Sequence, residues 1–96
     1  MLHMLINSPF HCNINLLAKM ISVDDDFIAL QDGVLISVQN NIFLKKLHFP
    51  LIEKLYVLRE DIIARGLSLH ISSLFSVVNY NYFINLTVKH NKQINW

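Results

Sequence analysis

The ten residues Leu58–Leu67, LREDIIARGL, carry the plainest structural signal in this chain of 96 residues. They overlap the end of an apolar run, Leu55–Leu58, whose composition is typical of a buried strand. Glu60 and Asp61 then stand where a helix N-terminus favours negative charge, and Gly66 stands where a helix ends. The stretch therefore predicts a strand that runs directly into a short helix.

Four short apolar runs recur along the chain, and they are nearly continuous rather than alternating. Continuous runs suit strands that are buried on both faces, as in a parallel sheet. The segments between them are long enough for the crossover helices that parallel strands need. The runs are Met1–Ile6, Phe27–Leu30, Leu55–Leu58 and Leu74–Val78. We predict one α/β domain over residues 1–96, with a small, open, mainly parallel sheet of about four strands and helices on both faces.

Two helices and two turns complete this prediction. Asn13 can cap a helix whose apolar face repeats at i, i+3, i+4 and i+7, through Ile14, Leu17, Ala18 and Ile21. Asp32-Gly33 predicts a sharp turn, because glycine permits positive φ, and Asn40-Asn41 predicts a second one. A short apolar segment, 42–47, then ends before Pro50.

The last helix is predicted to start near Asn79. Five residues share one of its faces: Tyr80, Phe83, Ile84, Thr87 and Val88. We expect Tyr80 and Phe83 to pack into the core, whereas Tyr82 and the distant Trp96 lie off this face.

The composition suggests a chain that buries surface against partners. Hydrophobic residues make up 53% and charged residues only 16%, against about 25% charged in an average domain. So small a domain has few charges to cover its surface, so part of that surface is expected to be apolar and covered. The alternative is a bias towards Ile, Asn and Lys from an AT-rich genome, in which Asn replaces charge.

Charge and targeting signals indicate the cellular compartment and the kinds of partner. The net charge is +1 and the densest basic cluster is Lys45-Lys46, so we expect no direct nucleic-acid contact. The N-terminus lacks a basic signal-peptide region, and no apolar stretch approaches the roughly 18 residues of a membrane span. A single cysteine fits a reducing compartment. We expect a cytoplasmic protein that does not engage a membrane.

Cys12 is the only thiol, and therefore the only residue able to carry a persulfide. It stands just before the first predicted helix, where amide groups and the helix dipole can stabilise a thiolate, and His11 lies beside it. The simpler interpretation is an ordinary small residue at a helix entry.

The spacing of histidines and glycines along the chain does not indicate a metal site or a nucleotide site. The five histidines, His3, His11, His48, His70 and His90, show no paired ligand spacing, so they predict scattered surface or edge positions rather than a metal site. With only two glycines, the chain has no phosphate-binding loop, and we expect no cofactor.

Five residues are candidates for an interaction surface. Asp32 follows a strand at the sheet edge where open α/β sheets place ligands, although it can equally cap a turn. Arg59 and Arg65 flank the short helix, and Tyr82 and Trp96 supply aromatic area of the kind that anchors interfaces.

Four segments, taken in order, resemble the DsrH-like family over nearly the whole chain. They are MLH…NSPF at 1–10, LQDGV at 30–34, LREDIIARGL at 58–67 and LTVKH at 86–90, ahead of the terminal Trp96. The resemblance implies a subunit of a bacterial sulfur-relay complex that 2-thiolates the wobble uridine of tRNA.

The same resemblance implies partners and a division of labour. It implies TusC-like and TusD-like subunits in a dimer of heterotrimers, and a TusE-like acceptor downstream. The working cysteine is expected on the TusD-like partner. Family members with a working cysteine carry it within the first helix, near Leu17-Ala18 here, where this chain has none. The resemblance thus implies a non-catalytic scaffold. Two alternatives are an independent persulfide carrier acting through Cys12 and a generic interaction domain without a sulfur role.

Overall fold

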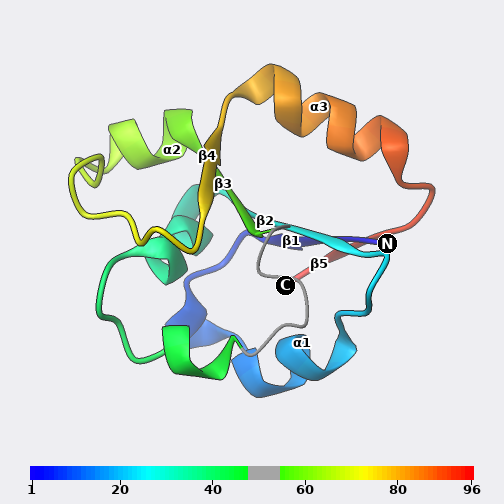
Figure 1. The fold of residues 1–96 in the computed structure, drawn as a ribbon, viewed down its shortest axis with the longest axis horizontal. Coiled ribbons are helices and arrows are strands. Elements are labelled where there is room, and N and C mark those ends of the chain that lie inside the picture. Colours follow the sequence, from blue (N-terminus) through cyan, green and yellow to red (C-terminus); the bar gives the residue numbers. More distant parts are fainter. Residues whose placement is uncertain (48–54) are drawn as a thin grey trace.

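A computed structural model of the chain describes residues 1–47 and 55–96. It contains a five-stranded sheet in the order β4-β3-β2-β1-β5, and all four strand pairings are parallel (Figure 1). The strands are β1 (Leu2–Leu5), β2 (Asp26–Ala29), β3 (Leu55–Leu58), β4 (Ser76–Val78) and β5 (Gln93–Asn95). The predicted mainly parallel α/β sheet is confirmed. The fifth strand was not predicted, because Gln93-Ile94-Asn95 contains no apolar run.

The α-helices begin close to the predicted positions. They are α1 (Ile14–Met20), α2 (Arg59–Ala64) and α3 (Tyr80–Lys89), with three 3-10 helices, η1 (Pro9–His11), η2 (Gln31–Ser37) and η3 (Leu44–Lys46). The side chains of Asn13 and Asn79 accept the backbone N–H groups of Leu16 and Tyr82, at 3.0 and 2.9 Å, and so cap α1 and α3. β3 runs directly into α2, and Gly66 follows that helix with φ +67°.

The sheet separates two apolar cores. The first contains Leu5, Leu17, Val34 and Ile62, so α1, η2 and α2 contribute to the same core. The second is smaller, and there Leu86 of α3 packs with strand residues such as Ile28 and Leu58. Figure 1 shows α1 and α3 on opposite sides of the sheet. The prediction of helices on both faces is confirmed.

Gly33 does not form the predicted turn. It lies within η2, and the positive φ angles nearby belong to Gln31 (51°) and Asn40 (61°) instead. Gly33 is there because η2 passes close to the end of β1: a Cβ atom on it would lie 1.9 Å from the carbonyl oxygen of Leu5. The turn predicted at Asn40 is confirmed, and Pro50 lies outside the described residues.

The prediction for the faces of α3 is partly wrong. Leu86 is the buried residue of this helix, and Phe83 is half-buried beside it. Tyr80 is 54% exposed and Val88 is 77% exposed, so the residues at i, i+4 and i+8 from Tyr80 point to solvent. The sequence shows two apolar stripes on α3, and the sheet covers only one of them. Over the described ranges 1–47 and 55–96, every helix is too short or too polar to cross a membrane.

Candidate functional site

A cluster of charged side chains joins α2 to η2 just beyond the carboxyl ends of β2 and β3. Arg65 donates a hydrogen bond to Asp32 at 3.0 Å and lies 3.8 Å from Asp61. Asp61 in turn accepts the backbone N–H of Gln31 at 2.6 Å, which holds Gln31 in its left-handed conformation. Two of the candidate interface residues, Asp32 and Arg65, thus meet as an exposed ion pair. Such pairs contribute about 0–1 kcal/mol, so this one positions the elements more than it stabilises them.

Arg59 occupies a different environment on the same helix. It lines a cavity of about 220 Å³, bordered by Arg59, Ile62, Ile63, Ser68, Ile71 and Val77. Within the part of the chain that the structure describes, no carboxylate pairs with its guanidinium. The two arginines flanking α2 therefore differ: Arg65 pairs with carboxylates of the fold, whereas Arg59 has no carboxylate partner among residues 1–47 and 55–96.

The candidate Tyr82 lies on α3, exposed, beside Tyr56 of β3, which packs against the second core. Its hydroxyl donates to the hydroxyl of Tyr56 at 3.2 Å, and the two rings are 5.2 Å apart between centroids. Burial, and then the hydrogen bond with Tyr82, raises the pKa of Tyr56 well above its usual range. The phenol of Tyr56 therefore stays neutral at physiological pH, and its contact with Tyr82 joins α3 to the sheet.

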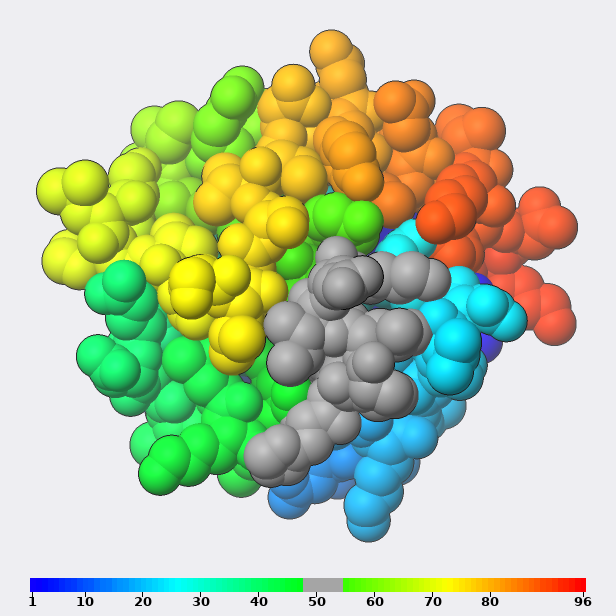
Figure 2. All heavy atoms as spheres, in the orientation of Figure 1, coloured from blue at the N-terminus to red at the C-terminus, as the bar shows by residue number. Residues whose placement is uncertain are grey.

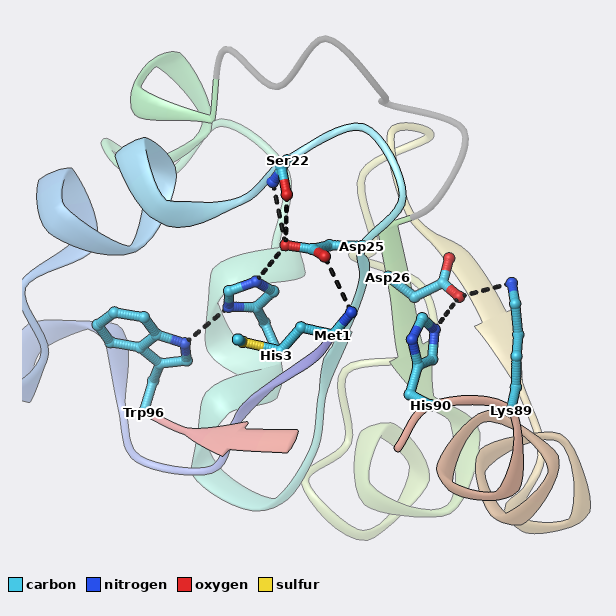
Figure 3. A network of polar contacts seen from close by, with 8 residues as sticks. All are labelled: Met1, His3, Ser22, Asp25, Asp26, Lys89, His90 and Trp96. Carbon is cyan, nitrogen blue, oxygen red and sulfur yellow. Dashed lines mark hydrogen bonds and ion pairs between the residues drawn. The ribbon is translucent and has the colours of Figure 1, made fainter. Parts of the chain in front are cut away.

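Trp96 is part of a buried hydrogen-bond chain that the sequence prediction missed (Figure 3). Its indole Nε1 donates to Nδ1 of His3 at 3.2 Å, and Nε2 of His3 lies 2.9 Å from Asp25. Because an indole only donates, Nδ1 must accept, so His3 is the neutral tautomer that donates through Nε2 to Asp25. Asp25 also accepts the N-terminal ammonium group and both donors of Ser22.

A second histidine–carboxylate pair stands next to the first (Figure 3). Asp26 lies 2.7 Å from Nε2 of His90 and accepts Nζ of Lys89 at 2.9 Å. Its other oxygen, Oδ1, is buried and has no partner within the ranges 1–47 and 55–96. Both contacts come from the C-terminal end of α3, so Asp26 fixes that end of the helix over the start of β2.

Hydrogen bonding keeps both aspartates ionised. Burial alone raises the pKa of each carboxyl, but the donors around it outweigh that effect. The bonds from His3, Ser22 and the N-terminal ammonium hold the pKa of Asp25 well below its usual value. Those from His90 and Lys89, with their charges, lower the pKa of Asp26.

The position of this network indicates a structural role. His3 is fully buried, so a substrate cannot reach its imidazole without opening the fold. The network instead ties β1, the segment before β2 and the chain's last residues together. Two signals in the sequence point to it: His3 interrupts an otherwise apolar run, and three aspartates precede a buried strand. The expectation that the histidines lie at the surface or an edge is wrong for His3 and His90.

The structure does not support an activated thiolate at Cys12. The residue is half-buried against the first core, and burial raises the pKa of its thiol. Of the two interpretations of Cys12, these contacts favour the ordinary residue at a helix entry, because the N–H group of Leu16 is taken by the cap residue Asn13 and burial is the cause of the pKa shift. At neutral pH this thiol is almost entirely protonated and therefore a weak nucleophile. Across the described residues, no three His, Cys, Asp or Glu side chains gather in a way that could hold a metal ion.

The fold and these contacts define a small parallel α/β domain whose polar network is structural and whose one thiol is not activated. The family model described as DsrH like protein matches residues 7–93, and the chain belongs to that family. The resemblance predicted from the four segments is thus confirmed.

Curated relatives match the chain from end to end. It is 53% identical to Protein TusB of Buchnera aphidicola subsp. Schizaphis graminum and 49% identical to Protein TusB of Buchnera aphidicola subsp. Acyrthosiphon pisum. It is 41% identical to Protein TusB of Photorhabdus laumondii, and each match covers 100% of both chains.

The solution NMR structure of protein Tm0979 from Thermotoga maritima has a similar fold. The TM-score is 0.67 at 24% sequence identity, over 96% of this chain and 97% of that one. At this identity the likeness supports the fold alone.

Proposed function

We propose that this chain is a non-catalytic subunit of a TusBCD-like sulfur-relay complex in the cytoplasm, required for 2-thiolation of the wobble uridine of tRNA. Its partners in this proposal are TusC-like and TusD-like subunits, arranged as a dimer of heterotrimers, and a TusE-like protein accepts sulfur from the complex. The observation that carries the proposal is end-to-end similarity to proteins named TusB, at 41–53% identity in three relatives.

The state of Cys12 supports the non-catalytic part of the proposal. Sulfur transfer through a persulfide needs a thiolate nucleophile, and the attacking group works best when its pKa is near the ambient pH. Burial raises the pKa of Cys12, and the chain has no second cysteine to resolve a persulfide. The first helix carries Leu17-Ala18 where members with a working cysteine have theirs, and Leu17 is fully buried. The active cysteine of the complex then belongs to the TusD-like partner.

The proposal also assigns tRNA contact to another protein. The net charge of +1 offers no basic face of the kind that neutralises phosphates. This chain therefore completes the assembly rather than holding the nucleic acid.

Complementation of a strain that lacks this gene tests the proposal. The measured quantity is the content of 5-methylaminomethyl-2-thiouridine in tRNA, by mass spectrometry of nucleosides. The wild-type gene and Cys12→Ser should both restore it, and an empty vector should not. Cys12→Ser loses little volume, so its cost in stability should be about 1 kcal/mol.

Two results would contradict the proposal. If the deletion strain keeps normal thiolation, the chain is not needed for the pathway. If Cys12→Ser loses thiolation while the complex still assembles, the thiol is catalytic, and a mass increase of one sulfur atom on the isolated wild-type protein would identify it as a persulfide carrier.

A further inference from the structure

The cavity beside α2 has the size and lining of a pocket for one apolar side chain. Its volume of about 220 Å³ is below the roughly 300–1,000 Å³ of sites that hold drug-sized molecules. Ile62, Ile63, Ile71 and Val77 make its walls aliphatic, and Ser68 and Arg59 are the polar residues among the six. A cofactor needs more room and more polar groups than this.

The positive charge of Arg59 at the pocket favours a ligand that carries a negative charge. It lies one helical turn from Ile63, so the two side chains share one side of α2. Arg65, at the other end of the helix, is occupied by Asp32 and Asp61. Arg59 has no such acid among the residues described, and a guanidinium pairs best with a carboxylate that it can bind through two parallel N–H groups. A complementary ligand therefore carries an apolar group next to a carboxylate.

The surroundings of the pocket favour a polypeptide as that ligand. Among the described residues, β4 is the last strand of the sheet and pairs with β3 along one edge only. Figure 2 shows the atoms of β4 and the preceding segment, gold and yellow, at the surface of the molecule. Val77 of β4 is 49% exposed and Ile63 is 59% exposed. An extended segment that lies along an open sheet edge can place alternate side chains into adjoining pockets.

We infer that this surface, formed by Arg59, Ile63, Val77 and the cavity between them, docks an extended segment of a partner subunit. The segment places an apolar side chain in the cavity and a neighbouring Asp or Glu carboxylate on Arg59. The inference rests on the proposed function, because the partner is one of the other subunits of the complex.

Assembly from purified proteins tests the inference with matched controls. The full chain is mixed with its TusC-like and TusD-like subunits, and the dissociation constant is measured by titration and light scattering. Arg59→Glu should weaken assembly about tenfold or more, and Ile63→Asp should do the same. Lys19→Glu and Leu16→Asp make the same changes at exposed positions of α1 and should have no effect. Circular dichroism of every variant checks that the chain is folded.

The outcomes separate this inference from the function on which it rests. If the wild-type chain does not assemble with the two subunits, the proposed function fails and the docking site falls with it. If the wild type assembles and both α2 variants assemble as tightly as the α1 controls, the docking site is wrong and the proposed function stands. If all four variants weaken assembly equally, the effect is not local to this surface and the inference is also wrong.

Cross-linking identifies the occupant. Val77→Cys in the Cys12→Ser background places a single thiol at the pocket, where a benzophenone label can capture what lies against it. The expected product is a cross-link to a partner segment with an acid beside an apolar residue, and replacing that acid by Lys should restore binding to Arg59→Glu. A cross-link to a second copy of this chain would show a self-interface and overturn the inference.

Discussion

At the scale of single residues, two neighbouring aspartates stabilise different parts of the fold. Asp25 fixes His3, and through it Trp96, whereas Asp26 fixes the end of α3 through His90 and Lys89. Asp26 begins β2 and Asp25 directly precedes it. Their side chains point to opposite faces of the sheet, because successive side chains alternate along an extended chain. Two adjacent aspartates therefore fix the C-terminal residue on one face of the sheet and the end of α3 on the other.

Replacing Asp25 by Asn should change how stability depends on pH. The folded-state pKa of Asp25 lies below its unfolded value of about 3.9. Its contribution to the free energy of unfolding is therefore fully present above the unfolded pKa, and it is lost as the pH falls through the folded pKa. Asp25→Asn should lower the free energy of unfolding by about 2 kcal/mol at pH 7, because hydrogen bonds to a charged group are lost. It should also flatten the decline in stability between about pH 5 and pH 2.

Urea unfolding at a series of pH values measures this effect. Asp24→Asn, at the exposed neighbouring position, is the matched control and should leave the curve within about 0.5 kcal/mol of wild type. Equal pH profiles for wild type and Asp25→Asn would mean that the carboxylate contributes nothing to stability.

The two glycines should differ in how alanine is tolerated. At Gly33 the added Cβ meets the carbonyl oxygen of Leu5, and the backbone must move, at a cost of about 3 kcal/mol. At Gly66 the space is open, but φ is +67°, so the cost is about 1 kcal/mol of backbone strain. Thermal unfolding of both variants measures the difference, and a Gly66→Ala variant less stable than Gly33→Ala would contradict it.

At the scale of elements, α3 is held at its two ends and along the side that faces the sheet. Its first turn is fixed by the cap Asn79 and by Glu60 of α2, which accepts the N–H group of Tyr80 at 2.9 Å. Its last turn is fixed at Asp26. Between them Leu86 is buried, Phe83 is half-buried beside it and Tyr82 contacts Tyr56 of β3, so one side of the helix packs on the sheet.

Shortening Leu86 should therefore destabilise the protein far more than shortening an exposed residue of the same helix. Leu86→Ala should cost about 3 kcal/mol, since it removes buried methyl groups and leaves a cavity. Val88→Ala should stay within about 0.5 kcal/mol of wild type, because Val88 is exposed. Chemical denaturation of the two variants compares them directly. Equal losses would show that the outer stripe of α3 is also packed in the isolated chain.

At the scale of the whole molecule, exposed apolar side chains lie on α1, α2 and α3, with Leu16 and Met20 on α1. Ile63 lies on α2, and Tyr80, Ile84 and Val88 form the outer stripe of α3. Only 16% of the residues are charged, so few charges separate these groups from one another. Apolar patches of this kind mark surfaces that partners cover.

We therefore expect the isolated chain to self-associate or to precipitate, and to become well behaved with its partner subunits. Sedimentation velocity at tens of micromolar, with and without the partners, measures this. The matched change is Val88→Lys, which places a charge in the outer stripe of α3 and should reduce self-association without unfolding the protein. A stable wild-type monomer that binds no apolar dye would overturn the expectation.

The sequence by itself determined the class of fold, the positions of the first four strands along the chain and the start of each α-helix. It could do so because these depend on local patterns: apolar runs, helix caps such as Asn13 and Asn79, and the strand–helix boundary at Leu58. The family followed from ordered segments along the chain and was confirmed by the comparison over residues 7–93.

Only the tertiary structure decided the fifth strand, the buried histidine pairs and the exposed stripe of α3. β5 forms because β1 offers it a free edge and Trp96 reaches His3, and neither condition is visible in Gln93-Ile94-Asn95. Likewise, Arg59 and Arg65 look alike in the sequence. They differ because the fold brings Asp32 and Asp61 to one and an apolar cavity to the other. Such contacts join residues distant along the chain, and local patterns do not encode them.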